Sequence, residues 1–433
     1  MFPEGWLRVP LREVAEVRTG VAKGKTNLRD PVELPYLRVA NVQDGHLNLS
    51  EVKNISVERE QVNRYALEVG DILMTEGGDF DKLGRGDVWQ GQIPVCLHQN
   101  HVFAVRPQKD RVDSSFLASL AASEHGRNYF LGCAKRSTNL ASINSSQLKS
   151  FPVIMPSLPD QQRIVAVLAK WDEAIGTVER LLANSRQQKL SVLNKTLRIP
   201  AAVTEVADRN RSGNHPPSVR AGIPRLPRTP SGWKRLHLGM HLSEVRRPVT
   251  LEPEREYTLV TVKRSRGGVH RRAVLRGSEV KTQTQFVVKA GDFLMSKRQI
   301  VHGACGIVPQ DLNGAVVSNE YAVLNSDGDI DLDFLRYLSE SIYFQQTCFH
   351  SSIGVHVEKM IFNTERWLAW PFNIPPLSEQ RRIVAVLDAA TAEVTAIERQ
   401  LVALRLEKRA LMQQLLTGKR RVHLTEPAEA VSQ

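Results

Sequence analysis

Cysteine and long hydrophobic runs are what this sequence has least of. Only four cysteines, at positions 96, 133, 305 and 348, occur in 433 residues. None belongs to a Cys-x-x-Cys pair, which argues against a zinc site and a disulfide framework. No apolar run reaches eighteen residues, so no membrane-spanning helix is expected. The N-terminal stretch MFPEGWLRVPLREV lacks the basic flank and apolar centre of a signal peptide. These absences fit the reducing cytoplasm.

Motifs of catalysis are also missing. The histidines form no His-x-x-x-His or His-Glu-x-x-His cluster of a zinc hydrolase. Residues 19–26 look like a phosphate-binding loop, but Thr19 stands where that motif needs glycine. We therefore expect a simpler loop that offers Lys23 and Lys25 to phosphates. The repeated Glu-Val-Lys at 51–53 and 279–281 is too short to identify a metal nuclease. No catalytic residue, metal site or cofactor of this chain itself is predicted.

Positive charge, in contrast, is abundant. The chain has 58 lysines and arginines against 46 acidic residues, which gives a formal net charge of +12. A surplus of this size indicates a polyanionic partner, and nucleic acid is the first candidate. A basic surface without any such partner remains the alternative, because composition alone does not separate the two.

The chain contains an internal repeat. PSLPDQQRIVAVL at 156–168 and PPLSEQRRIVAVL at 375–387 are identical at nine of thirteen positions. Earlier landmarks recur in the same order, although the first copy carries extra residues between Lys53 and Gly70: these are Gly5-Trp6 with Gly232-Trp233, Gly70-Asp71 with Gly291-Asp292, and Asn100 with Asn319. The repeat predicts two similar units in tandem, each with a divergent front and a well-matched back.

The backs, 156–199 and 375–418, are expected to be two long helices of about 38 residues, or roughly 57 Å each. Apolar residues recur at heptad spacing and predict a pairing seam. Its members are Ile164, Leu168, Trp171, Ile175, Val178 and Leu182 in the first helix, and Ile383, Leu387, Val394, Ile397, Leu401 and Leu404 in the second. The first seam weakens at Ser185, Lys189 and Thr196. We expect an antiparallel coiled coil, because a globular unit must fit between the two helices.

The fronts, 1–155 and 230–374, alternate short β-rich runs with turn-forming residues and one helical stretch each, at 114–131 and 331–349. The predicted fold class is therefore α/β (α+β), with two tandem mixed α/β domains separated by the two long helices. Residues 200–229, rich in proline and arginine, are interpreted as a linker. Residues 419–433 form a C-terminal tail.

Candidate nucleic-acid contacts come from charge and loop position. In the second front, no acid interrupts the basic run of Lys263, Arg264, Arg266, Arg271 and Arg272, and arginine suits phosphate and guanine. The polar segments after the Gly-Asp landmarks differ strongly between the units, which suggests that they read different things; they supply Thr75, Glu76, Lys82 and Arg85, and Lys297 and Arg298. Arg38, Asn41 and Asn139 complete the set. Ordinary solvated turns remain the alternative for all of them.

The Leu-x-x-Gln-x-Arg-Ile-Val pattern within Pro156–Val165 and Pro375–Val384, the tandem layout and the ending Leu415–Arg420 resemble the specificity subunits of Type I restriction–modification systems. The resemblance implies two target recognition domains, 1–155 and 230–374, each reading half of a bipartite double-stranded DNA sequence. It implies that the helices bind two methylase subunits, which bring S-adenosylmethionine. Restriction subunits, which use ATP and magnesium, would join them. The chain itself would be a non-catalytic subunit.

Three alternatives remain open at the level of sequence. They are a freestanding DNA-binding regulator, a DNA enzyme with an unrecognised site, and a scaffold without DNA affinity. The DNA sequence that would be read is not predicted.

Overall fold

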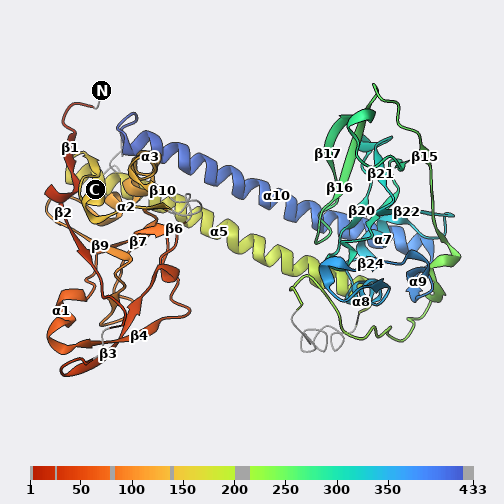
Figure 1. Ribbon diagram of the computed structural model, residues 1–433, viewed down its shortest axis with the longest axis horizontal. Coiled ribbons are helices and arrows are strands. Elements are labelled where there is room, and N and C mark those ends of the chain that lie inside the picture. Colours follow the sequence, from red (N-terminus) through yellow and green to blue (C-terminus); the bar gives the residue numbers. More distant parts are fainter. Residues whose placement is uncertain (1–2, 25–26, 79–82, 137–140, 200–214, 423–433) are drawn as a thin grey trace, which may run out of the picture. The chain divides into compact units, whose positions relative to one another are not determined.

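The computed structural model describes residues 3–24, 27–78, 83–136, 141–199 and 215–422. The chain divides into two compact units. The first unit comprises Met1–Arg180 and Arg399–Gln433, and the second comprises Leu181–Glu398. Each unit therefore contains one of the expected mixed domains and a part of both long helices (Figure 1).

The first unit is built on a four-stranded antiparallel sheet in the order β2-β9-β5-β7. Smaller sheets, β4-β3-β8, β10-β11-β6 and β1-β12, complete it. The strands are β1 (Leu7–Pro10), β2 (Ala15–Thr19), β3 (Pro31–Leu37), β4 (Lys53–Glu58), β5 (Ile72–Thr75), β6 (Gly77–Gly78), β7 (Gly86–Val88), β8 (Leu97–His98), β9 (Val102–Pro107), β10 (Lys135–Arg136), β11 (Ala141–Ser142) and β12 (Pro152–Met155). The helices are α1 (Val62–Tyr65), α2 (Ser114–Ala122), α3 (Glu124–Cys133), α4 (Ser145–Lys149) and the long α5 (Leu158–Thr196).

The second unit contains a four-stranded antiparallel sheet, β14-β22-β19-β20, and a five-stranded sheet, β15-β18-β21-β16-β17. Its strands are β13 (Lys234–His237), β14 (Leu242–Glu244), β15 (Pro248–Val249), β16 (Glu256–Val262), β17 (Val269–Arg276), β18 (Gln285–Val287), β19 (Phe293–Ser296), β20 (Cys305–Ile307), β21 (Val316–Ser318), β22 (Tyr321–Ser326), β23 (Ser352–Ile353), β24 (Ile361–Phe362) and β25 (Pro371–Ile374). Its helices are α7 (Leu332–Leu338), α8 (Ile342–His350), α9 (Thr364–Leu368) and the long α10 (Leu377–Leu416).

Strand pairing confirms the internal repeat. The order β2-β9-β5-β7 in the first unit has the same connectivity as β14-β22-β19-β20 in the second. A parallel pair also recurs, β3 with β8 and β16 with β21, and so does the antiparallel pair of first and last strands, β1 with β12 and β13 with β25. The extra residues of the first copy form the end of β4 and helix α1. The second unit instead adds β15 and β18 to its larger sheet.

Several expected elements differ in detail. The helical stretch at 114–131 is two helices, because Ser123 adopts an extended conformation between α2 and α3. The stretch at 331–349 is likewise divided into α7 and α8 before Ser341, which caps the second helix. The expected linker is not free of the domain: Val219 is buried, and the Ser218 hydroxyl lies 2.9 Å from Nδ1 of His302. Residues 200–214 lie outside the described part.

The predicted seam is buried. In α5, Ile164, Leu168, Ile175, Val178 and Leu182 are buried and Trp171 is half-buried; in α10, Ile383, Leu387, Ile397 and Leu401 are buried and Val394 and Leu404 are half-buried. The ends of the seam also join the domain cores. Ile164 and Leu168 belong to the core of the first unit, which includes Phe103 and Phe116, and Ile383 and Leu387 belong to the core of the second.

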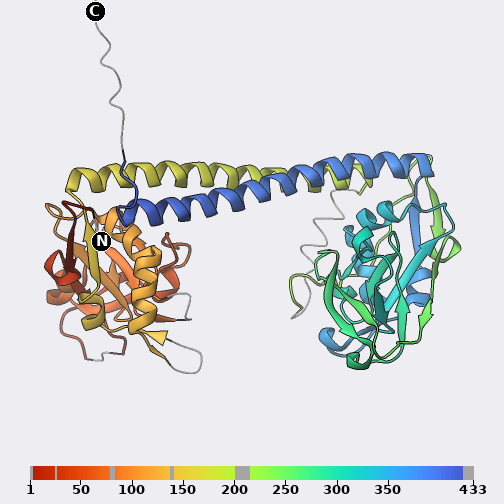
Figure 2. The ribbon, with the colours of Figure 1, turned by 90° about the horizontal axis from the view of Figure 1, so that it is seen from above.

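Polar pairs show that the two helices run antiparallel (Figure 2). In the first unit, Asp172 pairs with Lys408, and Glu179 lies 2.6 Å from Arg405. In the second, Arg186 lies 2.7 Å from Glu398, and the buried Ser185 donates to Glu393 at 2.8 Å. Within each unit, residue numbers fall along one helix as they rise along the other. In the weak stretch of the first seam, the polar side chain of Ser185 is therefore hydrogen-bonded to the other helix.

The C-terminal ends of the long helices dock against the Gly-Trp landmarks. Arg198, just beyond the end of α5, lies over the ring of Trp233, 5.4 Å from its centroid. Beyond α10, Gly418 has a φ of 71°, and a Cβ atom there would collide with Pro3 and Trp6. The end of α10 thus packs against Trp6, and the end of α5 packs against Trp233. Among the described residues, no helix is long and apolar enough to cross a membrane.

Candidate nucleic-acid interface

The basic run of the second unit lies in the hairpin of β16 and β17, whose turn spans residues 263–268. The turn is tied to the body of the unit by its backbone. The N–H groups of Ser265 and Arg266 donate to the carbonyls of His302 and Gly303, both at 2.8 Å. Ser265 and Arg266 have φ values of 55° and 58°, a region that residues other than glycine adopt rarely. The hairpin therefore leaves the domain in a defined direction.

The predicted basic residues of this hairpin fall into two groups. Arg264 pairs with Glu358 at 2.7 Å, and Arg266 donates from Nε to the carbonyl of Ser339 at 2.9 Å. These two side chains hold the turn in place. Lys263, Arg271 and Arg272, in contrast, are exposed and form no ion pair with any residue that the structure describes. Because β17 is an edge strand, the second group is open to a polyanion.

The Gly-Asp landmarks are buried ion pairs that position the ends of the central strands. Asp71 is almost fully buried and accepts two hydrogen bonds from Arg106 of β9, both at 2.8 Å. Its hydrogen bond raises the pKa of Arg106 above the usual value. In the second unit, Asn325 of β22 takes the place of Arg106 and donates to Asp292 at 3.2 Å. The guanidinium there comes from Arg247, 2.6 Å from the same carboxylate.

The residues that follow β5 and β19 occupy the same register but carry opposite charges. The carboxylate of Glu76 lies 2.6 Å from Nδ1 of His101. Its backbone N–H donates to the carbonyl of His101, and its carbonyl accepts from the N–H of Ile143. Lys297 donates its N–H to the carbonyl of Glu320 in the same way. The Lys297 ammonium lies 3.0 Å from Glu244.

Two of the remaining described contacts of these segments, Arg298 and Arg85, differ in exposure and in their partners. Arg298, which follows Lys297, forms an ion pair with Glu320. In the first unit, the side chain of Arg85 is half-buried, and its Nε has no hydrogen-bond partner among the described residues. Arg85 is therefore less exposed than the loop character of the sequence suggested, whereas Arg298 is exposed but paired with an acidic residue.

Elsewhere in the first unit, Lys23 is exposed, with its ammonium 5.9 Å from the centroid of the Tyr36 ring. Arg38 is half-buried and lies 3.4 Å from Glu51. Lys25, Lys82 and Asn139 lie outside the described residues. Among the described predicted contacts of this unit, Lys23 is thus the one exposed cation.

Two predicted contacts are wrong in this structure because their side chains are buried. Asn41 is 3% exposed; its amide donates to the carbonyls of Asn48 and Glu51 and its oxygen accepts from the N–H of Arg38. Thr75 has no exposed surface. Both are polar residues in loop-like sequence, but the side chain of Asn41 holds its own loop together by hydrogen bonds, and Thr75 is the last residue of the buried strand β5.

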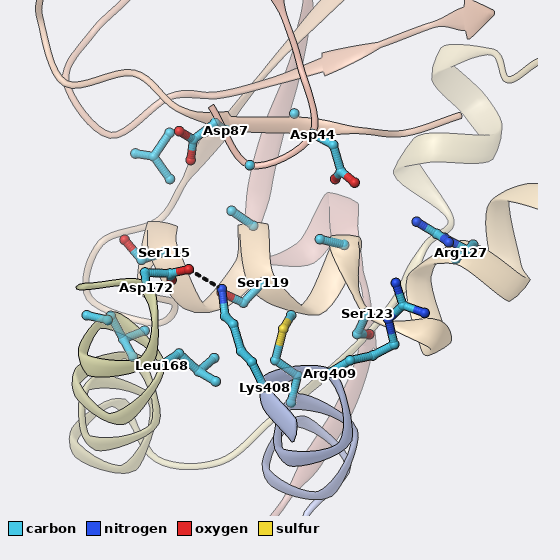
Figure 3. A pocket seen from close by; sticks show the side chains of 18 of the residues that line it. Asp44, Asp87, Ser115, Ser119, Ser123, Arg127, Leu168, Asp172, Lys408 and Arg409 are labelled. Carbon is cyan, nitrogen blue, oxygen red and sulfur yellow. Dashed lines mark hydrogen bonds and ion pairs between the residues drawn. The ribbon is translucent and has the colours of Figure 1, made fainter. Parts of the chain in front are cut away.

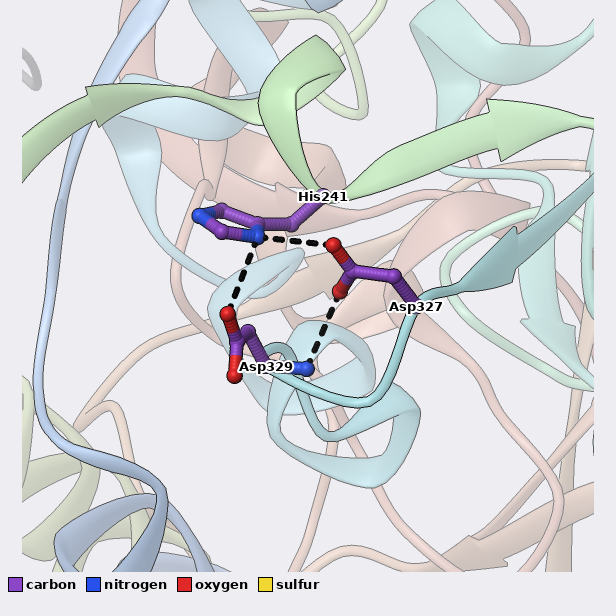
Figure 4. A group of neighbouring side chains, drawn as sticks. All are labelled: His241, Asp327 and Asp329. Carbon is purple, nitrogen blue, oxygen red and sulfur yellow. Dashed lines mark hydrogen bonds and ion pairs between the residues drawn. The ribbon is translucent and has the colours of Figure 1, made fainter.

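One group of side chains has the composition of a metal site. His241 lies 3.0 Å from Asp327 and 3.3 Å from Asp329 through its Nδ1 atom (Figure 4). The backbone N–H of Asp329 and the imidazole of His241 lower the pKa of Asp327. The Nδ1 atom of the imidazole lies within hydrogen-bond distance of both carboxylates, so contacts within the protein account for the arrangement. Both carboxylates are exposed, and among the described residues no further protein ligand accompanies them in the cluster.

A groove of about 740 Å³ lies in the first unit between helices α2 and α3, strand β7 and the two long helices. Small residues of one face of α2 form part of its lining (Figure 3): Ser115, Ala118, Ser119 and Ala122. Acidic groups (Asp44, Asp87, Asp172) and basic groups (Arg127, Arg405, Lys408, Arg409) surround it. Burial raises the pKa of Asp87. The small side chains of α2 would let another helix approach the groove closely, and the groove is bordered by charges of both signs.

Sequence reasoning missed the residues that fix this scaffold. Arg106 comes from β9, whereas Arg247 comes from the segment between β14 and β15, so the repeat could not reveal them. Glu244 was missed because it lies far in sequence from Lys297. Gln161 and Gln380 were visible in the repeated pattern, yet their role depends on contacts with distant backbone.

Comparison with known proteins gives a consistent result. A family model described as the Type I restriction modification DNA specificity domain matches residues 3–184 and 250–404, which is more than half of the chain. A chain from a solved structure of the type I R-M system shares the fold, with a TM-score of 0.56 at 18% identity over 97% of this chain and 100% of that one.

Two curated relatives are similar over parts of their length. The putative type I restriction enzyme MjaX specificity subunit of Methanocaldococcus jannaschii is 26% identical over 195 residues, 45% of this chain and 46% of that protein. The type I restriction enzyme EcoKI specificity subunit of Escherichia coli is 25% identical over 174 residues, 40% of this chain and 37% of that protein. The matches thus span less than half the length of these relatives. With its matched domain, repeat and fold, this chain belongs to the family of Type I restriction–modification specificity subunits.

Proposed function

We propose that this chain selects a bipartite double-stranded DNA sequence, one half through each mixed domain, for a Type I complex whose chemistry resides in other subunits. The observation that carries the proposal is a repeated scaffold with different side chains in equivalent places. Glu76 beside His101 in the first unit corresponds to Lys297 beside Glu320 in the second. Equal scaffolds with unequal polar groups suit two different base sequences, because base edges are read by hydrogen bonds.

Methylation mapping of the host genome tests this proposal directly. We expect one bipartite methylated motif with an unspecified spacer, and its loss when the gene for this chain is deleted. Persistence of every methylated motif in the deletion strain would contradict the proposal. A freestanding regulator, the other reading of the sequence, is not supported by the family to which the chain belongs, and it would leave methylation unchanged.

Binding of the chain to DNA should depend steeply on salt. If about six to eight phosphates are neutralised, the slope of log K against log salt should lie near −5 to −7. A slope shallower than about −2 would mean that the positive charge does not serve DNA. The double variant Arg271→Gln/Arg272→Gln should weaken binding and flatten the slope by about 2. Arg264→Gln is the matched control, because that arginine is already paired with Glu358.

The partners in the proposal are two methylase subunits, which supply S-adenosylmethionine, and restriction subunits, which use ATP and magnesium. The groove of the first unit offers one docking surface for a methylase helix. Its α2 face of alanine and serine permits close approach, and its charged border gives specificity. We expect Ala118→Arg to reduce co-purification of the methylase with a tagged chain. Exposed Ala183→Arg, on α5, is the control.

We place the chain in the cytoplasm, where its DNA and partners are. All four cysteines are free thiols, and three of them are buried. Burial raises the pKa of Cys96 to about 12, which keeps that thiol protonated and unreactive. Four unpaired thiols suit a reducing compartment.

A further inference from the structure

A second cavity, of about 290 Å³, lies wholly within the second unit. It opens where β14, β18 and β22 meet the segment that follows β19. Its lining comprises Glu244, Val245, Arg246, Phe286, Lys297, Asn319, Tyr321 and Val323. The cavity has about ten times the volume that a water molecule occupies in the liquid. It is thus suited to a small planar group rather than to a peptide segment.

The polar groups of this cavity form a donor and acceptor set. The ammonium of Lys297 lies 3.0 Å from Glu244, and both side chains are about one-fifth exposed. The guanidinium of Arg246 lies 3.7 Å from the same carboxylate. Two cations therefore share one anion, which leaves the site with a net positive charge. The Asn319 amide and the Tyr321 hydroxyl have no hydrogen-bond partner among the residues that the structure describes.

Two aromatic side chains, Phe286 and Tyr321, contribute to the lining. Aromatic faces stack on nucleobases of any sequence, while hydrogen bonds select among the bases. Lysine is a common donor to O6 and N7 of guanine, and a carboxylate accepts from exocyclic amino groups.

We propose that this cavity reads a guanine of the half-site assigned to the second domain; the inference rests on the proposed function. Lys297 donates to guanine O6 and N7 together. Glu244 accepts either from the amino group of the paired cytosine or, if guanine is extruded, from its own N1–H and N2–H groups. In both modes the ion pair of the free protein opens, and each member takes a complementary partner on the DNA.

The first unit lacks this donor at the equivalent place. Glu76, which has the register of Lys297, is an acceptor that lies 2.6 Å from His101. Its preferred bases are therefore those that offer an amino group, such as cytosine. The difference assigns guanine to the second half-site and separates the specificities of two domains with equal strand order.

The experiment is a selection of bound sequences from random DNA. It uses the complex purified from the host through a tag on this chain, with and without Lys297→Met. We expect the unaltered complex to enrich a bipartite motif with guanine at one position of one half-site. In the variant, preference at that position should fall about tenfold, while the other half-site stays unchanged. An identical motif from both complexes would overturn the inference and leave the proposed function intact.

Further variants guard against loss of folding. Glu244→Lys/Lys297→Glu retains an ion pair but exchanges donor and acceptor, so it should fold and lose the guanine preference; retention of that preference would overturn the inference. Lys281→Met, at an exposed position outside the cavity, should leave the motif unchanged. If the unaltered complex enriches no motif, the proposed function fails, and the inference fails with it.

Modified bases distinguish the two modes. Replacement of the selected guanine by 7-deazaguanine removes N7 and should weaken binding in both modes, because Lys297 reads that edge in each. Replacement by inosine removes the N2 amino group and should weaken binding if the base is extruded. Unchanged binding with both replacements would contradict the reading of guanine here.

Discussion

Gln161 accepts a hydrogen bond from the backbone N–H of Asp113 at 2.9 Å, although 48 residues separate them. The same amide donates to the carbonyls of Arg111 at 3.1 Å and Pro156 at 3.0 Å. In the second unit, Gln380 makes the equivalent bonds, accepting from Asp331 at 2.8 Å. It donates to the carbonyls of Asp329 and Pro375, both at 3.0 Å. This fully used, buried amide joins the start of each long helix to the start of α2 or α7.

Replacement of Gln161 by leucine should therefore loosen the joint between α5 and the first domain. The backbone groups of Asp113 and Arg111 would lose their partner, at a cost of about 1–3 kcal/mol for each group left buried and unsatisfied. Hydrogen exchange is the measurement, and we expect faster exchange in α2 and in the first turns of α5. Gln188→Leu, at an exposed position on the same helix, is the control. Equal exchange in both variants would show that the amide does not hold the joint.

The repeat made much of the fold predictable, and the two glutamines show why. Their side chains bond to backbone N–H and carbonyl groups, which do not depend on the identity of the partner residue. The same glutamine can therefore play the same role in both units although the surrounding sequence differs. The heptad seam was predictable for a similar reason, because periodicity depends on neighbours along one helix. The burial of Thr75 and Asn41 was not predictable, since a polar residue in a segment that leads into turn-forming residues looks like exposed loop unless the strand order is known.

The buried aspartates support a comparison between the two units. Arg106→Met would leave Asp71 with the backbone N–H of Glu68 at 2.8 Å as its remaining donor. Arg247→Met would leave Asp292 with the N–H of Lys289 at 2.7 Å and the amide of Asn325 at 3.2 Å. Loss of one member of a buried ion pair costs about 3–5 kcal/mol. We expect Arg106→Met near the upper value and Arg247→Met at or below the lower one.

Chemical denaturation followed by hydrogen exchange of each unit measures this difference. Arg12→Met, at an exposed position in the first unit, serves as the control for Arg106→Met. Equal losses from Arg106→Met and Arg247→Met would mean that the amide of Asn325 contributes nothing to holding Asp292. The sequence could not supply this comparison, because Arg247 has no charged counterpart at the matching place in the first copy.

The first unit should lose stability in mild acid because of His98. Burial lowers the pKa of His98 to about 4, below the usual value of about 6.5 in an unfolded chain. The unfolded state therefore takes up a proton at a higher pH than the folded state does. The contribution of His98 to stability is present above about pH 6.5 and is lost as the pH falls towards 4. The full loss amounts to about 3 kcal/mol.

His98→Leu tests this assignment. Neither ring nitrogen of His98 has a hydrogen-bond partner among the described residues, so the substitution removes the titrating group without breaking a bond. We expect the free energy of unfolding of the first unit to depend less on pH between 7 and 5 than in the unaltered chain. His101→Leu, which removes an exposed imidazole in the same unit, provides the comparison. If both variants keep the original pH dependence, other groups cause it.

The pairing of the long helices can be tested by introducing aspartate at two leucines of α10, Leu401 on the buried face and Leu406 on the exposed face. Leu401 is 8% exposed within the seam, whereas Leu406 is 65% exposed. Aspartate at 401 removes buried apolar contacts and introduces a carboxylate without a partner, which together cost about 3 kcal/mol or more. Aspartate at 406 faces water and should cost less than about 0.5 kcal/mol.

We expect Leu401→Asp alone to accelerate hydrogen exchange in the parts of α5 and α10 that belong to the first unit. The ion pair of Glu179 with Arg405, at 2.6 Å, lies on the exposed side of the pair and is too weak to compensate. Equal exchange in the two variants would mean that the seam does not hold these helices together.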